Sequence, residues 1–115
     1  MQFMLLLYGD PAQDENATPA EREASLQAHI AFARALRDAG AMAGGDELQA
    51  PMTARTVRLG IGAPVISDGP FAETREQLGG YYLVEAQDID EAVRWAVQVP
   101  APGWAIEVRP VSTYA

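Results

Sequence analysis

Residues 2–8 read QFMLLLY, and this stretch decides the fold. In an extended strand, Phe3 and Leu5 point to one side, while Met4 and Leu6 point to the other. A strand that is apolar on both sides is normally buried on both sides. The stretch therefore predicts a central strand in a sheet whose two faces are both covered.

A long helix is expected after a polar loop at residues 9–17. Thr18-Pro19-Ala20-Glu21 has the features of a helix start, with a threonine cap, a proline at the first helical position and a glutamate three residues after the cap. The helix should run to about Ala39 and end at Gly40. At helical spacing, one of its faces carries Ser25, His29, Phe32, Ala33 and Leu36.

The rest of the chain alternates predicted strands with short helical segments. Glycine and proline mark most of the boundaries between them. In chain order, we expect a strand at 41–48 with a bulge or a close backbone approach at Gly44-Gly45, a hairpin at 55–59 and 64–67, one helical turn at 74–77, a strand at 80–86, a helix from Asp88 to about residue 99, and a strand at 104–111.

The order β-α-β-β-β-α-β predicts an α+β fold in a single domain, residues 1–115. Two β-α-β units that share one sheet give a ferredoxin-like plait, here with an added hairpin. Two helices cover only one face of such a sheet, yet residues 80–86 are also apolar on both faces. We therefore expect a homodimer in which a second copy covers the other face.

Composition excludes several classes of function. The chain has sixteen acidic residues, eight arginines, no lysine, no cysteine and one histidine, with a net charge of −8. This charge disfavours direct binding of nucleic acid or of anionic membranes. No apolar run approaches the roughly 18 residues of a membrane span, and no signal peptide is visible. We expect a cytoplasmic protein with no cofactor and no metal site.

Residues 68–82 read DGPFAETREQLGGYY, which closely resembles the signature of the DGPF, or YCII-related, family. Arg75 stands where the family usually has lysine, which keeps the positive charge. The resemblance covers nearly the whole chain, including the opening MQFMLLLYGD and the segment Glu107-Val108-Arg109-Pro110 near the end. It implies a ferredoxin-like monomer that forms a dimeric α+β barrel.

The resemblance implies less about activity. A few relatives are lyases or dehalogenases that act on small ring compounds, and other cofactor-free dimeric barrels are isomerases and monooxygenases. Many members of the family are encoded beside extracytoplasmic-function sigma factors. A regulatory role with a sigma factor as partner therefore stands beside an enzymatic one.

His29 and Asp68 are the candidate catalytic residues. His29 is the only side chain whose unperturbed pKa lies near neutrality, and its place on the apolar face of the helix points it at the sheet. Asp68 is expected to end a strand of the sheet on which the helix packs, so we expect it to accept a hydrogen bond from the imidazole and to orient it. The alternatives are a core histidine bonded to the backbone and an ordinary Asp-Gly turn.

Four further side chains are candidates for substrate binding: Phe71, Glu73, Tyr82 and Arg109. Arg109 would hold a substrate carboxylate with two hydrogen bonds. Three of them also have a structural interpretation. Glu73 fits a solvated surface, Tyr82 fits a core or interface aromatic, and Arg109 fits an edge-strand ion pair with Glu107 or Glu85.

The candidate residues suggest an enzyme, and the resemblance also allows a regulatory protein. The first is a cofactor-independent enzyme that binds a small, largely apolar molecule and transfers a proton, as an isomerase or a lyase does, through His29 and Asp68. The second is a non-enzymatic ligand-binding or regulatory dimer that acts with a sigma factor. A haem-binding barrel with His29 as the ligand is a third, but the helix face offers little volume for it.

Overall fold

The structure is a computed structural model that describes residues 1–113. A short 3₁₀ turn at Pro51–Thr53 accompanies its regular elements. Those elements are β1 (Gln2–Gly9), α1 (Pro11–Glu15), α2 (Pro19–Asp38), β2 (Met42–Glu47), β3 (Arg55–Arg58), β4 (Val65–Asp68), β5 (Gln77–Glu85), α3 (Ile89–Ala96) and β6 (Ala105–Pro110).

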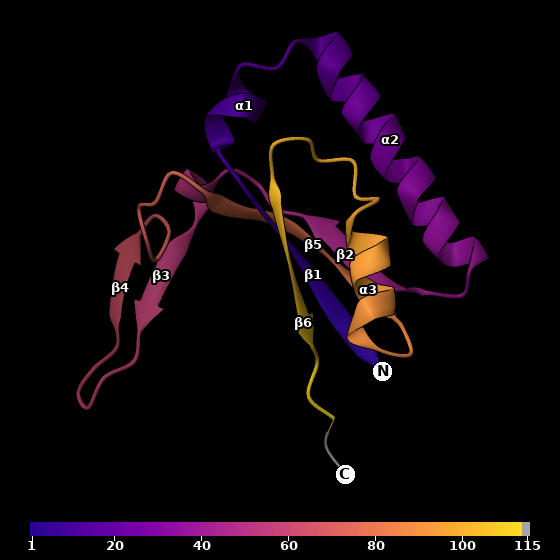
Figure 1. Ribbon diagram of the computed structural model, residues 1–115. Helices are drawn as coiled ribbons and strands as arrows, with labels where there is room; N and C mark the ends of the chain where they lie inside the picture. The colour runs from indigo at the N-terminus through magenta and orange to yellow at the C-terminus, as the bar shows by residue number, and fades with distance from the viewer. Residues whose placement is uncertain (114–115) are drawn as a thin grey trace.

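Four of the strands form an open antiparallel sheet in the order β2-β5-β1-β6. The prediction of an α+β fold is confirmed, and β1 is one of the two central strands (Figure 1). The predicted irregularity in β2 is also present, because the register against β5 shifts between Met42 and Gly44. β2 and β6 are the edges of the sheet, so a single chain does not close it into a barrel.

Helices α2 and α3 start directly after the capping residues predicted for them, Thr18 and Asp88. The Thr18 hydroxyl accepts the backbone N–H of Glu21, and the Glu21 carboxylate accepts the backbone N–H of Thr18. This reciprocal pair satisfies two N–H groups that have no partner within the helix. At the start of α3, the Asp88 carboxylate accepts the N–H of Glu91.

The core lies between one face of the sheet and the helices. Phe3, Leu5, Leu36 and Val84 are its largest fully buried side chains. On the other face of the sheet, Met4 and its neighbours are only half-buried and belong to no buried cluster. Within the chain, β1 is therefore fully buried on only one of its two sides, although burial on both sides was expected.

Two local expectations are corrected near the ends of β1 and β5. Residues 9–17, expected as a loop, contain α1, because the Asp10 carboxylate accepts the N–H of Ala12 and Pro11 takes the first helical position. Residues 74–77, expected as a helical turn, instead lead into β5, because Arg75 and Glu76 form a bend and Gln77 is the first residue of the strand. There the Gln77 side chain donates to the carbonyls of Ala72 and Thr74, while Gln77 itself pairs with Gly9 in the sheet.

Helix α3 is shorter than the helix expected from Asp88 to about residue 99. Its apolar spacing suggested a helix to about residue 99, but α3 ends at Ala96. Val97 caps its last turn with a backbone N–H that donates to the carbonyl of Val93. Val97 and Gln98 then form a turn, and Val99 is no longer helical, because the residue that precedes a proline avoids helical backbone angles.

β3 and β4 form a separate two-stranded hairpin, which we call the hairpin arm (residues 55–68). Arg55 faces Asp68 and Val57 faces Ile66 across the arm, as the sequence predicted for a hairpin here. The arm projects away from the four-stranded sheet (Figure 1). The radius of gyration is 16.1 Å, whereas a compact chain of this length has roughly 13 Å.

Candidate functional site

A cavity of about 550 Å³ opens between the two N-terminal helices and one end of the sheet. Its walls come from α1, from the first half of α2, from the end of β2 and from the start of β5. His29, Glu47, Gly79 and Trp104 are among the residues that line it. The two N-terminal helices and two strands from later in the chain therefore converge on the side of the sheet where His29 was expected.

His29 is fixed by Tyr82. The imidazole Nδ1 lies 2.6 Å from the Tyr82 hydroxyl oxygen, and the two rings are nearly parallel, with centroids 6.0 Å apart. Phe32 packs its edge against the Tyr82 ring at a centroid distance of 4.9 Å. Because Nδ1 is engaged, Nε2 is the ring nitrogen left for a ligand.

Burial sets the protonation states of this pair. It lowers the pKa of His29 below its ordinary value of 6.5, and the carboxylate of Glu47 partly opposes the shift. Burial and the same carboxylate both raise the pKa of Tyr82 above 10.0. At neutral pH the imidazole is therefore uncharged and the phenol keeps its proton, which suits a histidine that accepts a proton.

Glu47 is a site residue that the sequence reasoning missed. It is the last residue of β2 and lies opposite Gly80 in β5. Side chains at two glycines would force the strands apart, because a Cβ at Gly45 would lie 2.9 Å from the Tyr81 carbonyl and one at Gly80 would lie 2.9 Å from the Asp46 carbonyl. The Gly44-Gly45 pair was a signal of this close approach, and Glu47 follows it directly.

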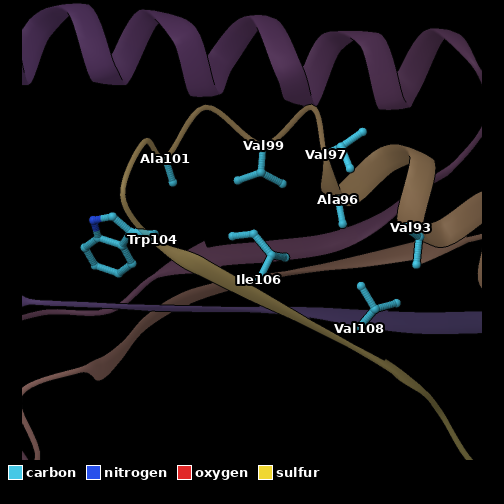
Figure 2. Close-up of a pocket in the computed structure, with 8 residues that line it drawn as sticks. All are labelled: Val93, Ala96, Val97, Val99, Ala101, Trp104, Ile106 and Val108. Carbon is cyan, nitrogen blue, oxygen red and sulfur yellow. The ribbon is translucent and has the colours of Figure 1, made fainter.

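Trp104 forms another wall that was not anticipated. Its indole lies over Gly9 and Gly79, and a Cβ at Gly79 would come within 2.6 Å of the ring. The same indole borders a second, apolar groove of about 470 Å³ between α3 and β6 (Figure 2). Trp104 therefore borders both the His29 cavity and this groove.

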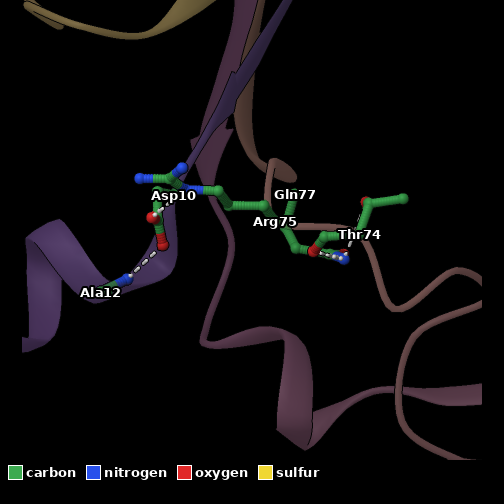
Figure 3. A network of polar contacts seen from close by, with 5 residues as sticks. All are labelled: Asp10, Ala12, Thr74, Arg75 and Gln77. Carbon is green, nitrogen blue, oxygen red and sulfur yellow. Dashed lines mark hydrogen bonds and ion pairs between the residues drawn. The ribbon is translucent and has the colours of Figure 1, made fainter.

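A polar network ties the segment before β5 to the wall of the cavity (Figure 3). The Arg75 guanidinium donates to the Asp10 carboxylate at 3.0 Å, and Asp10 also caps α1. The hydrogen bond from the Ala12 N–H lowers the pKa of the Asp10 carboxyl most, and the hydrogen bond from Arg75 lowers it further. The middle of the DGPFAETREQLGGYY stretch thus helps to position α1, whose residues line the cavity.

Asp68 does not meet His29. Its carboxylate is 93% exposed and lies 3.5 Å from the Arg55 guanidinium in the hairpin arm. The expected hydrogen bond rested on the assumption that the strand before Asp68 belongs to the sheet under α2, whereas that strand belongs to the separate hairpin. Tyr82, expected only as a substrate-binding candidate, takes the place of Asp68 as the partner of the imidazole.

The other three candidates also lie outside the lining of the cavity. Phe71 is 72% exposed, with the Arg58 guanidinium 4.9 Å above its ring. Glu73 is exposed in the loop before β5. Arg109 lies 4.0 Å from Glu107, which is the edge-strand ion pair considered as its alternative.

Among residues 1–113, no cluster of three or more histidine, cysteine, aspartate or glutamate side chains has a geometry that suits a metal ion. Within the same residues, no helix combines the length and the apolar character needed to cross a membrane.

The fold and the site together define a class of protein. It is an α+β domain with an open sheet and a cavity that contains a histidine. The model of the YCII-related domain family matches residues 1–114, and the chain belongs to this family. The chain is also 33% identical over 118 residues to an uncharacterized protein of Rhizobium meliloti (strain 1021), an alignment that covers 99% of this chain and 94% of that protein.

Proposed function

We propose that the cavity binds a small molecule and that His29 transfers a proton within it. The observation that carries this proposal is the 2.6 Å contact between His29 and Tyr82 at the wall of the cavity. A neutral imidazole held in one orientation is the arrangement that a general base requires. An isomerisation or an elimination needs only such a group, with no further co-reactant.

The proton follows a short path in this mechanism. In one tautomer, Nδ1–H of His29 donates to the Tyr82 oxygen, which leaves the lone pair of Nε2 free for a C–H proton of the ligand. The imidazolium that forms is stabilised by the Glu47 carboxylate, whose attraction partly offsets the lowering of the His29 pKa by burial. In an isomerisation His29 returns the proton to a different carbon of the ligand, and in an elimination a leaving group departs with the bonding pair.

The single histidine makes a direct test of this site practicable. We expect compounds that bind to shift the ring resonances of His29 when small carbonyl and hydroxy compounds are added to the labelled protein. Nuclear magnetic resonance of the ring ¹³C and ¹⁵N nuclei measures this, and saturation transfer to the compounds detects binding independently. Compounds that bind without moving the His29 signals would contradict the proposed site.

The same screen tests the alternative function. A ligand that binds at His29 but is never converted would favour the non-enzymatic ligand-binding or regulatory dimer, with a sigma factor as its expected partner. Conversion of a bound compound would favour the enzyme.

We also propose that the chain is a ferredoxin-like plait that pairs face to face as a dimeric α+β barrel. The strand order β2-β5-β1-β6, with both long helices on one face, supports the plait. The centre of the open face is apolar, with Met4 facing Leu83 and Leu6 facing Tyr81, and Glu107 borders it on β6. An apolar centre with a charged rim is the usual anatomy of an interface.

Light scattering tests this dimer. We expect a mass about twice 12.4 kDa at micromolar concentration. Leu6→Arg should shift the chain to the monomer, because it places a charge at the centre of the proposed interface. Val97→Arg is the matched control, since this side chain is 77% exposed on the helical side. A wild-type monomer, or a dimer that Leu6→Arg leaves intact, would contradict the proposed face.

A further inference from the structure

The hairpin arm carries an apolar surface that nothing in the described chain covers. Val57 and Ile66 face each other across the two strands and are 53% and 66% exposed. Leu59, directly after β3, is 82% exposed. We call these three side chains the arm face. An exposed cluster of this kind marks an interaction site more often than a freely solvated surface.

The arm also has little to hold it in place. A two-stranded hairpin is at best marginally stable in water on its own. The hydrogen bonds at its base, from the Gly69 N–H to the Ala54 carbonyl and from the Thr56 hydroxyl to the Gly69 carbonyl, join the arm to its own flanks. Packing against another surface would therefore stabilise the arm.

The surface area that a stable dimer buries suggests that the arm packs on a second copy of the chain. A standard interface buries roughly 800 Å² on each partner. The apolar side chains at the centre of the open sheet face are already half-buried by their neighbours, so covering them alone adds only part of that area. The arm face, with side chains that are half to four-fifths exposed, supplies further apolar area.

The charge of the arm favours the same partner. Residues 55–68 contain Arg55 and Arg58 but only one acid, Asp68, whereas the chain as a whole has a net charge of −8. The arm therefore has a net charge of +1, and it is attracted to a second copy of this chain through that copy's overall negative charge.

We infer that the hairpin arm clasps a second copy of the chain, with the arm face packed on the partner subunit. This inference rests on the proposed dimer and adds a second contact to it. Asp68 and Arg55 lie on the same side of the hairpin as Val57 and Ile66, by the alternation of side chains along a strand. Their ion pair therefore lies at the edge of the same interface, which gives Asp68 a role in assembly.

The absence of cysteine from the sequence allows a site-specific test of the clasp. Ile66→Cys and Ser67→Cys place single thiols on opposite sides of one strand. The rate of alkylation by iodoacetamide is measured for each full-length variant, with light scattering on the same samples. On going from a concentration that favours the monomer to one that favours the dimer, we expect the Ile66→Cys rate to fall about tenfold and the Ser67→Cys rate to change less than about twofold.

The outcomes separate the clasp from the dimer itself. A dimer in which Ile66→Cys reacts as fast as it does in the monomer would overturn the clasp and leave the sheet-to-sheet dimer intact. A chain that stays monomeric at every concentration would overturn both. Equal protection of the two thiols would also overturn packing through the arm face. If Ile66→Cys does not fold, Leu59→Cys compared with Arg58→Cys gives the same contrast.

Discussion

Replacement of His29 by glutamine should reduce turnover of a bound substrate at least about a hundredfold, the lower range of what a general acid–base contributes. Glutamine keeps hydrogen-bonding groups near Tyr82 but does not take up a proton at neutral pH. Because the imidazole is only half-buried, the fold and the dimer should persist. Steady-state kinetics on a substrate found by the screen, together with circular dichroism, measure both effects.

Two further variants make this result specific. Tyr82→Phe keeps the ring that packs against Phe32 and loses only the hydroxyl, so it should reduce turnover less than His29→Gln does. Gln27→Ala, on the same helix, removes an exposed hydrogen bond to Glu23 and should leave turnover unchanged. If His29→Gln unfolds the protein, the histidine is a packing element and the catalytic proposal fails.

The same His29→Gln variant should change how stability depends on pH. The pKa of His29 is lower in the folded chain than its ordinary value of 6.5, so the unfolded chain takes up this proton first as the pH falls. The contribution of His29 to the free energy of unfolding is therefore complete above pH 6.5 and is lost as the pH falls toward the lowered pKa. Urea unfolding between about pH 7 and 5 should show a shallower dependence in the variant.

The parts of the fold that the sequence predicted well are those set by neighbouring residues. The reciprocal cap of Thr18 and Glu21, the break at Gly44 and the pairing of the arm all depend on side chains within a few positions of one another. Capping and turn chemistry act over this range. Even α1, which was missed, starts from a local cap at Asp10 that was read as part of a loop.

The candidate site was harder to predict because its contacts join distant segments. The contact between His29 and Tyr82 spans 53 positions, and it forms because α2 crosses the face of the sheet on which Tyr82 lies. Asp68 was placed beside His29 on the expectation that it ends a strand of the sheet on which the helix packs. Residues 55–68 form a second sheet instead, and alternation of side chains within a strand cannot indicate to which sheet the strand belongs.

Gly79→Ala should destabilise the folded chain by about 1–3 kcal/mol, the usual range when a methyl group is forced into a filled space. The new Cβ would lie 2.6 Å from the Trp104 ring, so the indole must move away from β5. Because Trp104 lines the cavity beside His29, ligand affinity should fall together with stability. Gly9→Ala should act in the same direction, since its Cβ would also meet this ring.

Urea unfolding and tryptophan fluorescence measure this effect together. The emission of the Gly79→Ala variant should shift toward that of a solvated indole, while Trp95, which packs against Phe32, supplies a constant background. Gly60→Ala is the matched control, because a Cβ there meets no atom within 4 Å, and it should change neither stability nor emission. Native emission and native ligand affinity in Gly79→Ala would mean that the indole is not held against β5. The wall between the cavity and the apolar groove would then have to come from other residues.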